Sequence, residues 1–359
     1  CELIEYSDTD DCVGELSSRL APGSLGVDKD WPCRFLLPLM EKRRDLAVSL
    51  GSPAVDGARM RKTEEELNLM RLSSRMNDAV IGCAIDSVRA GATEKDVAEC
   101  YAGEAAAQGA SGESFPSLIC FGANCAEPHH DTGRTVLKNG DSVILDVGLV
   151  LDDYCSDMTR TVFYGAPTDE QKRVYDLVLR ANEAGRRAVR PGVPLKEIDR
   201  AARSVIEDAG YGAYFIHRTG HGIGLDVHEF PDVSASSEAV CAPGMVFSVE
   251  PGVYLPGRFG VRIEDLVAVT EDGGETWRDC WADPEVLAAC LPVEQFGSAR
   301  AAWSAVRSVE LRPAGVNGAY LLVRYTPYDS VYTLDLTAVR QTFLSPAAPS
   351  AALTAAAVS

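Results

Sequence analysis

The sequence predicts an α+β fold in which two similar halves surround one curved antiparallel sheet. Two observations indicate this fold. The order of two amphipathic helices followed by a strand hairpin occurs twice along the chain. Each hairpin is a β-branched and apolar stretch, and the first folds back on itself at a polar turn. We expect the helices to pack on the outer face of the sheet.

The first half is predicted to begin with two helices. A capping box at Thr63 and Glu66 opens a stretch whose apolar residues follow helical spacing as far as Val88. A second helix begins at Thr93, in EKDVAECYAGEAAAQG, and ends at a glycine. The first hairpin follows as SVILDVGLVLDDYCSDMTRTVFYG.

The second half repeats this order. One predicted helix runs from Thr168 through about Val189, and another runs from Pro194 to Gly210. The strands MVFSVEPGVYL and GVRIEDLVAVT follow them. The recurrence indicates a duplicated half and defines a predicted main domain at residues 57–278.

Segments on either side of the main domain differ from it. Residues 1–56 are predicted to be a truncated N-terminal α/β domain, with strands at LGV and DLAVSL and a helix around WPCRFLLPLM. Because the chain starts at Cys1, we expect a fragment or a processed product. The stretch GSPAVDGAR has the composition of a linker. Residues 279–359 form an atypical tail, in which GAYLLVRYTPYDSVYTLDL is a candidate hairpin and AAPSAALTAAAVS is expected to be disordered.

Composition excludes several classes of function. The net charge of -19 disfavours binding to nucleic acid and to anionic lipid. The chain contains no apolar run long enough for a membrane span, and its acidic start is unlike a signal peptide. Its eleven cysteines are an odd number without a CxxC pair, which favours reduced thiols. We therefore expect a cytoplasmic globular protein without nucleic-acid or membrane partners.

Both hairpins place carboxylates where a buried strand is normally apolar. These residues are Asp146, Asp157, Glu250 and Glu264. If the first hairpin has a two-residue loop at Asp152 and Asp153, Asp146 lies opposite Thr159 and shares a face with Asp157, roughly 7 Å apart at Cβ. A buried carboxylate without a partner is costly, so each acid requires compensation.

Two kinds of compensation are open. Each acid can pair with an arginine, for which Arg160 and Arg262 are candidates. Alternatively, two divalent cations balance the four carboxylates, with one histidine completing the set. Such a dinuclear site, with ions roughly 3.5 Å apart, ionises a bridging water that acts as a nucleophile. Four acids in corresponding strands favour the second explanation.

The histidines are concentrated in one glycine-rich stretch, HRTGHGIGLDVHE, which contains His217, His221 and His228. The glycines exclude the helix of an HExxH zinc motif, and GHGIG does not fit GxGxxG. They suggest an extended or tightly turned backbone that substrate and metal can approach. For His217 alone, a hydrogen-bonded structural role is an equal alternative. The other two histidines, His129 and His130, follow a proline in PHH.

Five short motifs together resemble a known family. LDVG, CSDMTRT, GHGIGLDVHE, VEPGVY and RIED, in this order, are similar to the pita-bread metallopeptidases of the aminopeptidase P and prolidase branch. The resemblance extends from about Thr63 to about Asp272. It departs at the tip of the first hairpin, where Asp153 stands in place of the glycine usual in the family, and aspartate tolerates positive φ better than most residues.

The resemblance implies a ligand set for two metal ions. Asp146 is expected to bind one ion, Asp157 and Glu264 to bridge both, and His221 with Glu250 to complete the second site. Manganese is the expected metal because carboxylate-rich sites favour hard cations, with cobalt or zinc as alternatives.

The resemblance also implies catalytic and substrate-binding roles. Glu250 is expected to take a proton from the nucleophilic water and to pass it to the leaving nitrogen. His129 and His228 are expected to hold the substrate and stabilise the oxyanion. His217 resembles a histidine of the substrate pocket, and Arg262 resembles an arginine that orients the acids and belongs to the substrate site.

The expected activity is hydrolysis of the bond between an N-terminal residue and a following proline, by an Xaa-Pro aminopeptidase. An Xaa-Pro dipeptidase (prolidase) is the main alternative. A non-catalytic binding module usually loses the ligands that this chain keeps, and a creatinase-like hydrolase does not need them. In proline-directed relatives the N-terminal domain helps to form the pocket and a dimer, so a homodimer is expected. His130 is interpreted as structural.

Overall fold

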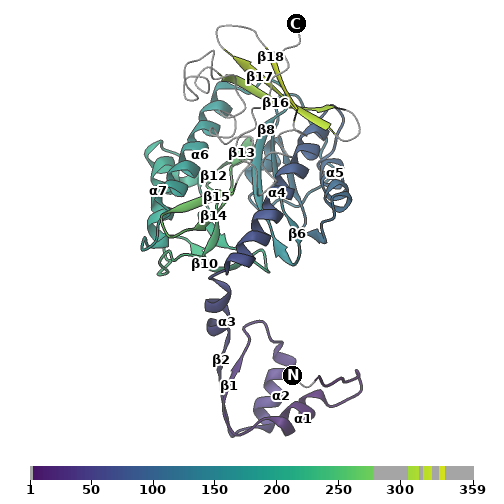
Figure 1. Cartoon of the computed structure of the whole chain (residues 1–359), viewed down its shortest axis with the longest axis vertical. Helices are drawn as coiled ribbons and strands as arrows, with labels where there is room; N and C mark the ends of the chain where they lie inside the picture. Colours follow the sequence, from purple (N-terminus) through teal and green to yellow (C-terminus); the bar gives the residue numbers. More distant parts are fainter. Residues whose placement is uncertain (1–2, 278–305, 315–317, 326–330, 336–359) are drawn as a thin grey trace, which may run out of the picture.

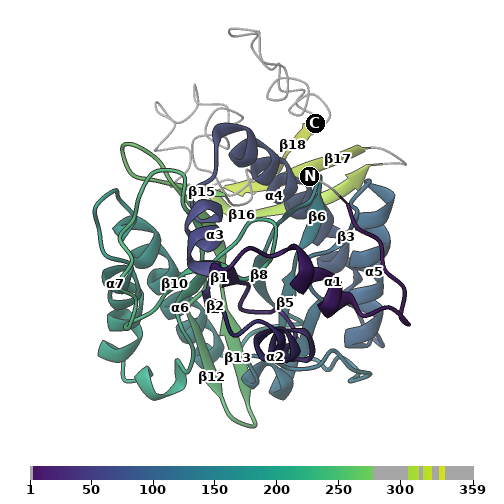
Figure 2. The same ribbon diagram turned by 90° about the horizontal axis from the view of Figure 1, so that it is seen from below.

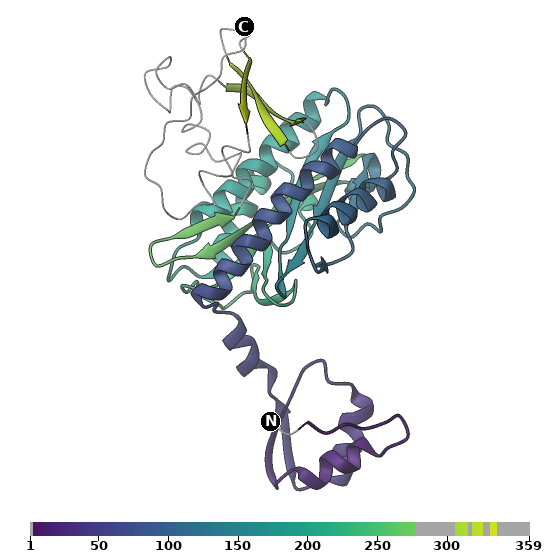
Figure 3. The same ribbon diagram turned by 45° about the vertical axis from the view of Figure 1, so that its right-hand side comes forward.

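The computed structural model of the chain describes residues 3–277, 306–314, 318–325 and 331–335. Figures 1 and 2 show α6 and α7 on one side of the strands and α5 on the other, and Figure 3 shows the long helix α4 running across the molecule in front of α6. The four helices of the two halves are α4 (Glu64–Ser87), α5 (Glu94–Ala107), α6 (Asp169–Ala188) and α7 (Leu195–Asp208). This order confirms the predicted α+β fold with two similar halves.

Three of these helices begin at capping boxes. In α4 the Thr63 side chain accepts a hydrogen bond from the Glu66 amide, and the Glu66 carboxylate accepts one from Thr63 N. Such reciprocal bonds satisfy amides that a helix start leaves without an intrahelical partner. The same arrangement opens α5 at Thr93 and α6 at Thr168. The predicted helix starts are confirmed.

The first hairpin has the predicted two-residue turn. Asp152 and Asp153 adopt φ values of 48° and 68°, as a type I′ turn requires. This turn sets the register that places Asp146 opposite Thr159, as predicted. The ladder is interrupted at Gly148, where a Cβ atom would lie 2.2 Å from the carbonyl oxygen of Ser156. The strands are β5 (Ser142–Val147), β6 (Leu149–Leu151), β7 (Tyr154–Cys155) and β8 (Met158–Phe163).

The second hairpin is interrupted in the same way. Its ladder stops at Glu250 and Pro251 on one strand, and at Ile263 and Glu264 on the other. The hairpin turns around Gly257, whose φ of 70° favours glycine. The strands are β11 (Val246–Val249), β12 (Gly252–Leu255), β13 (Phe259–Arg262) and β14 (Asp265–Val269).

Because of these interruptions, the expected curved sheet consists of several shorter ladders. The main orders are β4-β5-β8 and β10-β9-β11-β14-β15, with β3-β6-β7 and β12-β13 beside them. Backbone and side-chain bonds join the halves, among them Glu264 N to Thr159 O at 3.1 Å and Thr161 Oγ1 to Arg262 O at 2.7 Å. The remaining elements of this domain are β3 (Gly112–Glu113), β4 (Leu118–Phe121), β9 (Gly220–Gly222), β10 (Glu229–Val233), β15 (Gly274–Trp277), η1 (Gly122–Ala126) and η2 (Gly212–Tyr214).

Each half has its own apolar core between helices and strands. In the first half Val80 of α4 and Tyr101 of α5 are fully buried against Val143 and Leu145 of β5. In the second half Val178 of α6 packs in a cluster with residues of β12 and β13. Burying these apolar side chains fixes the strands that carry the acids.

The N-terminal part is the expected α/β unit, in which β1 and β2 pair in parallel. The predicted linker is helical, because residues 52–59 form the helix α3, which lies between the N-terminal elements and α4 in Figure 1. Pro53 stands in the first helical turn, where proline is tolerated, and the buried Ser52 hydroxyl accepts a bond from Lys29 N. The predicted boundary after residue 56 falls inside α3, and the domain division stays a prediction. The elements are α1 (Cys12–Arg19), β1 (Gly23–Val27), α2 (Cys33–Lys42), β2 (Leu46–Leu50) and α3 (Ser52–Arg59).

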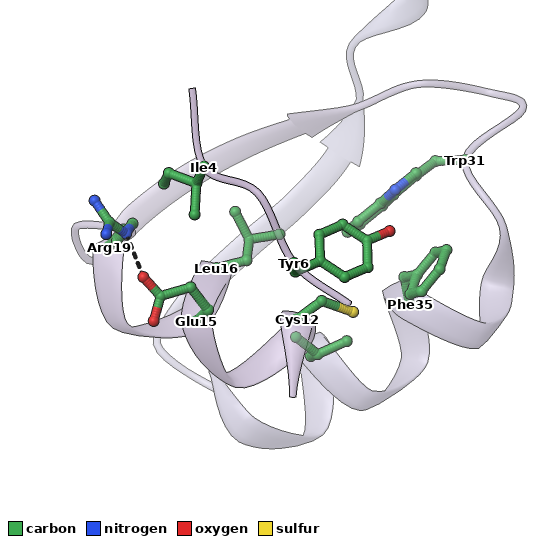
Figure 4. A pocket seen from close by; sticks show the side chains of 9 residues that line it. Ile4, Tyr6, Cys12, Glu15, Leu16, Arg19, Trp31 and Phe35 are labelled. Carbon is green, nitrogen blue, oxygen red and sulfur yellow. Dashed lines mark hydrogen bonds and ion pairs between the residues drawn. The ribbon is translucent and has the colours of Figure 1, made fainter. Parts of the chain in front are cut away.

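This N-terminal part also contains an apolar hollow of about 280 Å³. Figure 4 shows Tyr6, Trp31 and Phe35 around it, with the ion pair of Arg19 and Glu15 at its edge. None of the sequence-predicted site residues lines this hollow.

Beyond residue 277 the described segments are β16 (Val306–Ala314), β17 (Gly318–Tyr325) and β18 (Val331–Asp335). They pair antiparallel in this order, which confirms the hairpin predicted in the tail. The stretch AAPSAALTAAAVS lies outside the described residues. In the described part of the chain, no helix has the length and apolar character of a membrane span.

Candidate metal centre

The five predicted metal ligands come from both halves and lie where strands pair or stop pairing. Asp146 is in β5 and His221 is in β9, whereas Asp157, Glu250 and Glu264 stand at the interruptions of the two hairpins. An interruption in a ladder releases a residue from regular alternation and changes the direction of its side chain. The interrupted hairpins therefore let acids from different strands face one point.

Three of these residues form a compact group. One ligand atom from each of Asp157, His221 and Glu264 lies within 4.8 Å of the others, and all three side chains are buried. Nε2 of His221 lies 3.6 Å from Oδ2 of Asp157 and 3.4 Å from Oε1 of Glu250. The structure thus brings together four of the five predicted ligands: Asp157, His221, Glu250 and Glu264.

The fifth predicted ligand, Asp146, is held by an arginine. Its Oδ2 accepts a hydrogen bond of 2.6 Å from Nη2 of Arg262, which is 3% exposed. The arginine explanation considered for the four acids therefore applies to Asp146. Arg160 pairs instead with Asp265, at 3.0 Å. Arg262 thus orients one acid, and its expected part in the substrate site stays a prediction.

Two hydroxyl groups that the sequence reasoning missed support the acids. Thr159 Oγ1 donates to Glu264 Oε2 at 2.7 Å, and Ser248 Oγ donates to Glu250 Oε1 at 3.1 Å. Thr159 is two residues from Asp157 in the sequence, and Ser248 is two residues from Glu250. This closeness in sequence to the predicted ligands was a usable signal.

Burial makes the acid cluster hold protons strongly. Burial raises the pKa of Asp157 and of Glu264 well above the ordinary values, and the neighbouring carboxylates add to the effect. For Glu250, burial raises the pKa to about 7, and Arg262 opposes this increase. Like charges in a dry site cannot all ionise without compensation. Such perturbed acids are typical of functional sites.

The residues present fit divalent cations. Three of the predicted ligands each have one buried carboxylate oxygen without a hydrogen-bond donor among the described residues: Asp146 Oδ1, Asp157 Oδ1 and Glu264 Oε1. Buried polar atoms without partners are rare, and a cation is the partner that carboxylate oxygens and one imidazole select. A bound cation would also offset the mutual repulsion of these acids.

His221 has the orientation that a metal ligand needs. Its Nδ1 bonds to the carbonyl oxygen of Gly222 at 3.0 Å, so Nδ1 carries the proton and Nε2 faces the acids. Burial lowers its pKa to about 3, with His228 adding to the decrease. The imidazole is therefore neutral near pH 7 and able to donate a lone pair.

His217 lies further from the acid cluster, in a chain of hydrogen bonds. Its Nδ1 bonds to Arg218 O at 2.6 Å, and its Nε2 lies 2.8 Å from the hydroxyl of Tyr254. The Tyr254 hydroxyl also accepts a bond from Arg262 Nη1 at 3.0 Å. Both ring nitrogens of His217 are thus used by the protein, as the structural alternative describes, and its substrate role stays a prediction. Tyr254 was missed by the sequence reasoning.

The two histidines expected to face the substrate are both exposed. His228 packs edge-on against His221, with 4.3 Å between ring centroids, and burial of part of its ring lowers its pKa. His129 follows Pro128, whose carbonyl oxygen accepts a bond of 3.1 Å from Arg262 Nη1. Arg262 therefore connects the acid cluster to the loop that carries His129.

The glycines of GHGIG are explained by neighbouring parts of the protein. A Cβ atom on Gly220 would lie 1.8 Å from Ser248 O, and one on Gly222 would lie 2.4 Å from Phe230 O. On Gly224 it would lie 2.7 Å from a carboxylate oxygen of Glu229. These glycines therefore allow close packing of β9 against the neighbouring strands, whereas the predicted approach of substrate and metal stays a prediction.

The two halves and the carboxylate-rich centre between them define a pita-bread metallopeptidase. Residues 68–271 match the family model of metallopeptidase family M24, so the chain belongs to this family. This match confirms the family and the fold that the five motifs predict.

Relatives of known structure are peptidases of the predicted class. The chain is 35% identical to a prolidase from Thermococcus sibiricus, with a TM-score of 0.74 and 77% of each chain covered. It is 31% identical to an X-Pro aminopeptidase from Thermotoga maritima, with a TM-score of 0.68, 76% of this chain and 78% of that one covered. It is also 40% identical to an uncharacterized peptidase of Staphylococcus aureus (strain MSSA476) over 214 residues, which is 60% of this chain. The chain therefore spans about three fifths of the length of that relative, because the match covers 61% of it.

Proposed function

We propose that this protein is an Xaa-Pro aminopeptidase that releases an N-terminal residue preceding proline. The observation that carries the proposal is the buried group of Asp157, His221 and Glu264, completed by Glu250 and Asp146, with carboxylate oxygens lacking donors among the described residues. The printed names of two similar structures, a prolidase and an X-Pro aminopeptidase, support a proline-directed exopeptidase.

We propose that the five ligands hold two divalent cations, with manganese the preferred metal and cobalt or zinc as alternatives. Asp157 and Glu264 would contribute to both ions, Asp146 to one, and His221 with Glu250 to the other. When bound, the cations would polarise the substrate carbonyl and lower the pKa of water. Carboxylate oxygens make up most of the set, which favours a hard cation.

The protein side chains would move the protons and bind the developing charge. Burial raises the pKa of Glu250 to about 7, so its carboxylate can accept a proton from the attacking water and return it to the leaving nitrogen. The exposed imidazoles of His129 and His228 would donate N–H groups to the oxyanion. Arg262 keeps the Asp146 carboxylate oriented through its hydrogen bond of 2.6 Å.

Selection of proline follows from its nitrogen. A bond before proline is a tertiary amide, so its nitrogen has no hydrogen for a pocket to bind, and recognition depends on the fit of the ring. An Xaa-Pro dipeptidase is the second candidate, favoured by the prolidase among the similar structures. A non-catalytic binding module is disfavoured because all five ligand positions retain donor side chains.

Two variants test the metal centre. We expect Asp157→Ala and His221→Ala to lose the bound cations and all cleavage of Ala-Pro-Ala, because each removes a buried ligand. Glu238→Gln changes an acid whose side chain is 87% exposed, and serves as the control. Bound metal is measured by elemental analysis and released alanine by chromatography. If the metal-loaded protein bound two ions and left both Ala-Pro and Ala-Pro-Ala intact, the proline-directed assignment would be wrong.

Comparing the two substrates separates the two candidates. An aminopeptidase cleaves Ala-Pro-Ala, whereas a dipeptidase cleaves only Ala-Pro. A dipeptidase result would replace the first proposal with the second and leave the metal centre unchanged.

We also propose a cytoplasmic homodimer. Free cysteines among the described residues support a reducing compartment. Exposed apolar side chains of the N-terminal part, including Leu3, Tyr6 and Leu37, support a contact surface. Light scattering of the purified protein measures its mass, and a monomer at micromolar concentration would contradict the dimer.

A further inference from the structure

A buried acid outside the metal centre organises the loop before β5. Glu94, the first residue of α5, is fully buried. Its Oε1 accepts hydrogen bonds from Phe121 N at 2.9 Å and from Asn124 Nδ2 at 2.7 Å. Its Oε2 accepts one from Gly133 N at 3.0 Å and lies 3.1 Å from Nε2 of His130. One carboxylate thus ties together both ends of the segment 121–133.

This segment carries His129, and both sequence neighbours of His129 are fixed. The Pro128 carbonyl oxygen accepts a bond from Arg262. The His130 ring bonds to Glu94. His129 itself is exposed, and it lies near enough to His217 and His228 to contribute to the lowering of the pKa of each. Its side chain therefore projects from a backbone anchored on two sides, beside the candidate substrate-facing histidines.

We infer that Glu94 and His130 form a positioning pair that sets the place of the His129 imidazole in catalysis. The inference rests on the proposed function, in which His129 binds the oxyanion. A loop on the surface loses conformational freedom only where bonds compensate the entropy, and here one buried carboxylate supplies several of them. Misplacing a catalytic group by about 1 Å can cost about 100-fold in rate, so a fixed loop has catalytic value.

A helix-capping role alone does not explain Glu94. The capping box of Thr93 and Asp96 already satisfies the start of α5. The Glu94 carboxylate bonds to groups of the segment 121–133 instead. The pair also gives His130 a role in the site that the sequence reasoning did not assign.

A double-mutant cycle tests the inference. The variants are Glu94→Gln, His129→Ala and the double variant, assayed on the manganese-loaded full chain with Ala-Pro and Ala-Pro-Ala. Glutamine keeps the shape of Glu94, but its amide NH2 group is a donor and would face the donor of either Gly133 or Asn124, so that hydrogen bond is lost. We expect His129→Ala to lower kcat about 100-fold and Glu94→Gln about 10- to 100-fold, with KM and bound metal near wild type.

In the double variant, kcat should equal that of His129→Ala within about twofold, because Glu94 acts through His129. The control is Glu127→Gln, whose side chain is 74% exposed and lies 3.6 Å from Nδ1 of His130, and which should behave as wild type. His130→Gln retains a donor for Glu94, and we expect it to keep much of the activity that His130→Ala loses. If Glu94→Gln does not fold, His130→Ala takes its place in the cycle.

The inference would be overturned if kcat of the double variant fell by the product of the two single-variant decreases. Normal kcat in both Glu94→Gln and His130→Ala would also overturn it. A wild-type protein that cleaves neither substrate would overturn the proposed function, and the inference with it. The two results that overturn the inference alone can be seen only with an active wild type. They are therefore distinguishable from failure of the proposed function.

Discussion

Removal of the cations should make the stability of the fold depend on pH through the acid cluster. Burial raises the pKa of Glu250 to about 7 from an ordinary value of 4.5. Between these two values the folded state binds more protons than the unfolded state. The free energy of unfolding therefore falls as the pH rises through this window, and the contribution is complete only below the lower value.

The size of the effect follows from the two values. The difference between about 7 and 4.5, at about 1.4 kcal/mol for each pH unit, corresponds to about 3 kcal/mol for Glu250. Asp157 and Glu264 act in the same direction, because burial also raises the pKa of each. Bound cations should reverse the trend, since the acids must lose their protons to bind them.

Urea unfolding followed by circular dichroism measures this dependence. Wild type and Glu250→Gln, both freed of metal with a chelator, are compared between about pH 5 and about pH 8. Glutamine is chosen because its neutral amide does not titrate in this range. We expect the variant to gain stability relative to wild type by about 3 kcal/mol as the pH rises. Glu238→Gln, with an exposed side chain, should follow the wild type. Parallel curves for wild type and Glu250→Gln would refute the reasoning.

Three further substitutions test the fold around the site. In Gly220→Ala the new Cβ would lie 1.8 Å from Ser248 O, so we expect the free energy of unfolding to fall by about 1–3 kcal/mol. Calorimetry should also show weaker metal binding. Gly57→Ala is the control and should be tolerated, because a Cβ atom there meets open space. Asp153→Gly relieves a φ of 68° and should raise stability by up to about 1 kcal/mol in urea unfolding; a lower value would contradict the strain argument. Leu145→Ala leaves a cavity at a fully buried position and should lower the free energy of unfolding by about 2–5 kcal/mol in urea unfolding, without loss of bound metal in calorimetry. A variant that loses both stability and bound metal would show that the core and the metal centre are not separable.

Local patterns predicted the helix starts and the register of the first hairpin. Thr63, Thr93 and Thr168 each begin a helix, because a capping box is contained within a few consecutive residues. The register around Asp146 was predictable for the same reason, since a two-residue turn fixes every pair of the hairpin. The family resemblance then supplied the expected ligand roles.

Interactions between distant segments were not predictable from these patterns. Arg262 and Asp146 are 116 residues apart, and Glu94 and Gly133 are 39 apart. A hydrogen bond of this kind depends on the packed backbone and leaves no periodic signal in sequence. The helix α3 was missed because its proline and glycine are typical of a linker, whereas burial of Ser52 depends on contacts with the strand end at Asp28.

The hydrogen bonds between the halves also determine when the site can form. The Thr159 hydroxyl reaches Glu264 across 105 residues, and Asp146 needs Arg262 from the opposite half. Closing such long loops costs entropy that is recovered only after the intervening chain is ordered. During synthesis, the first hairpin would emerge with its acids uncompensated, and would acquire its partners only after nearly the whole domain had been made. Cation uptake should therefore report completion of folding.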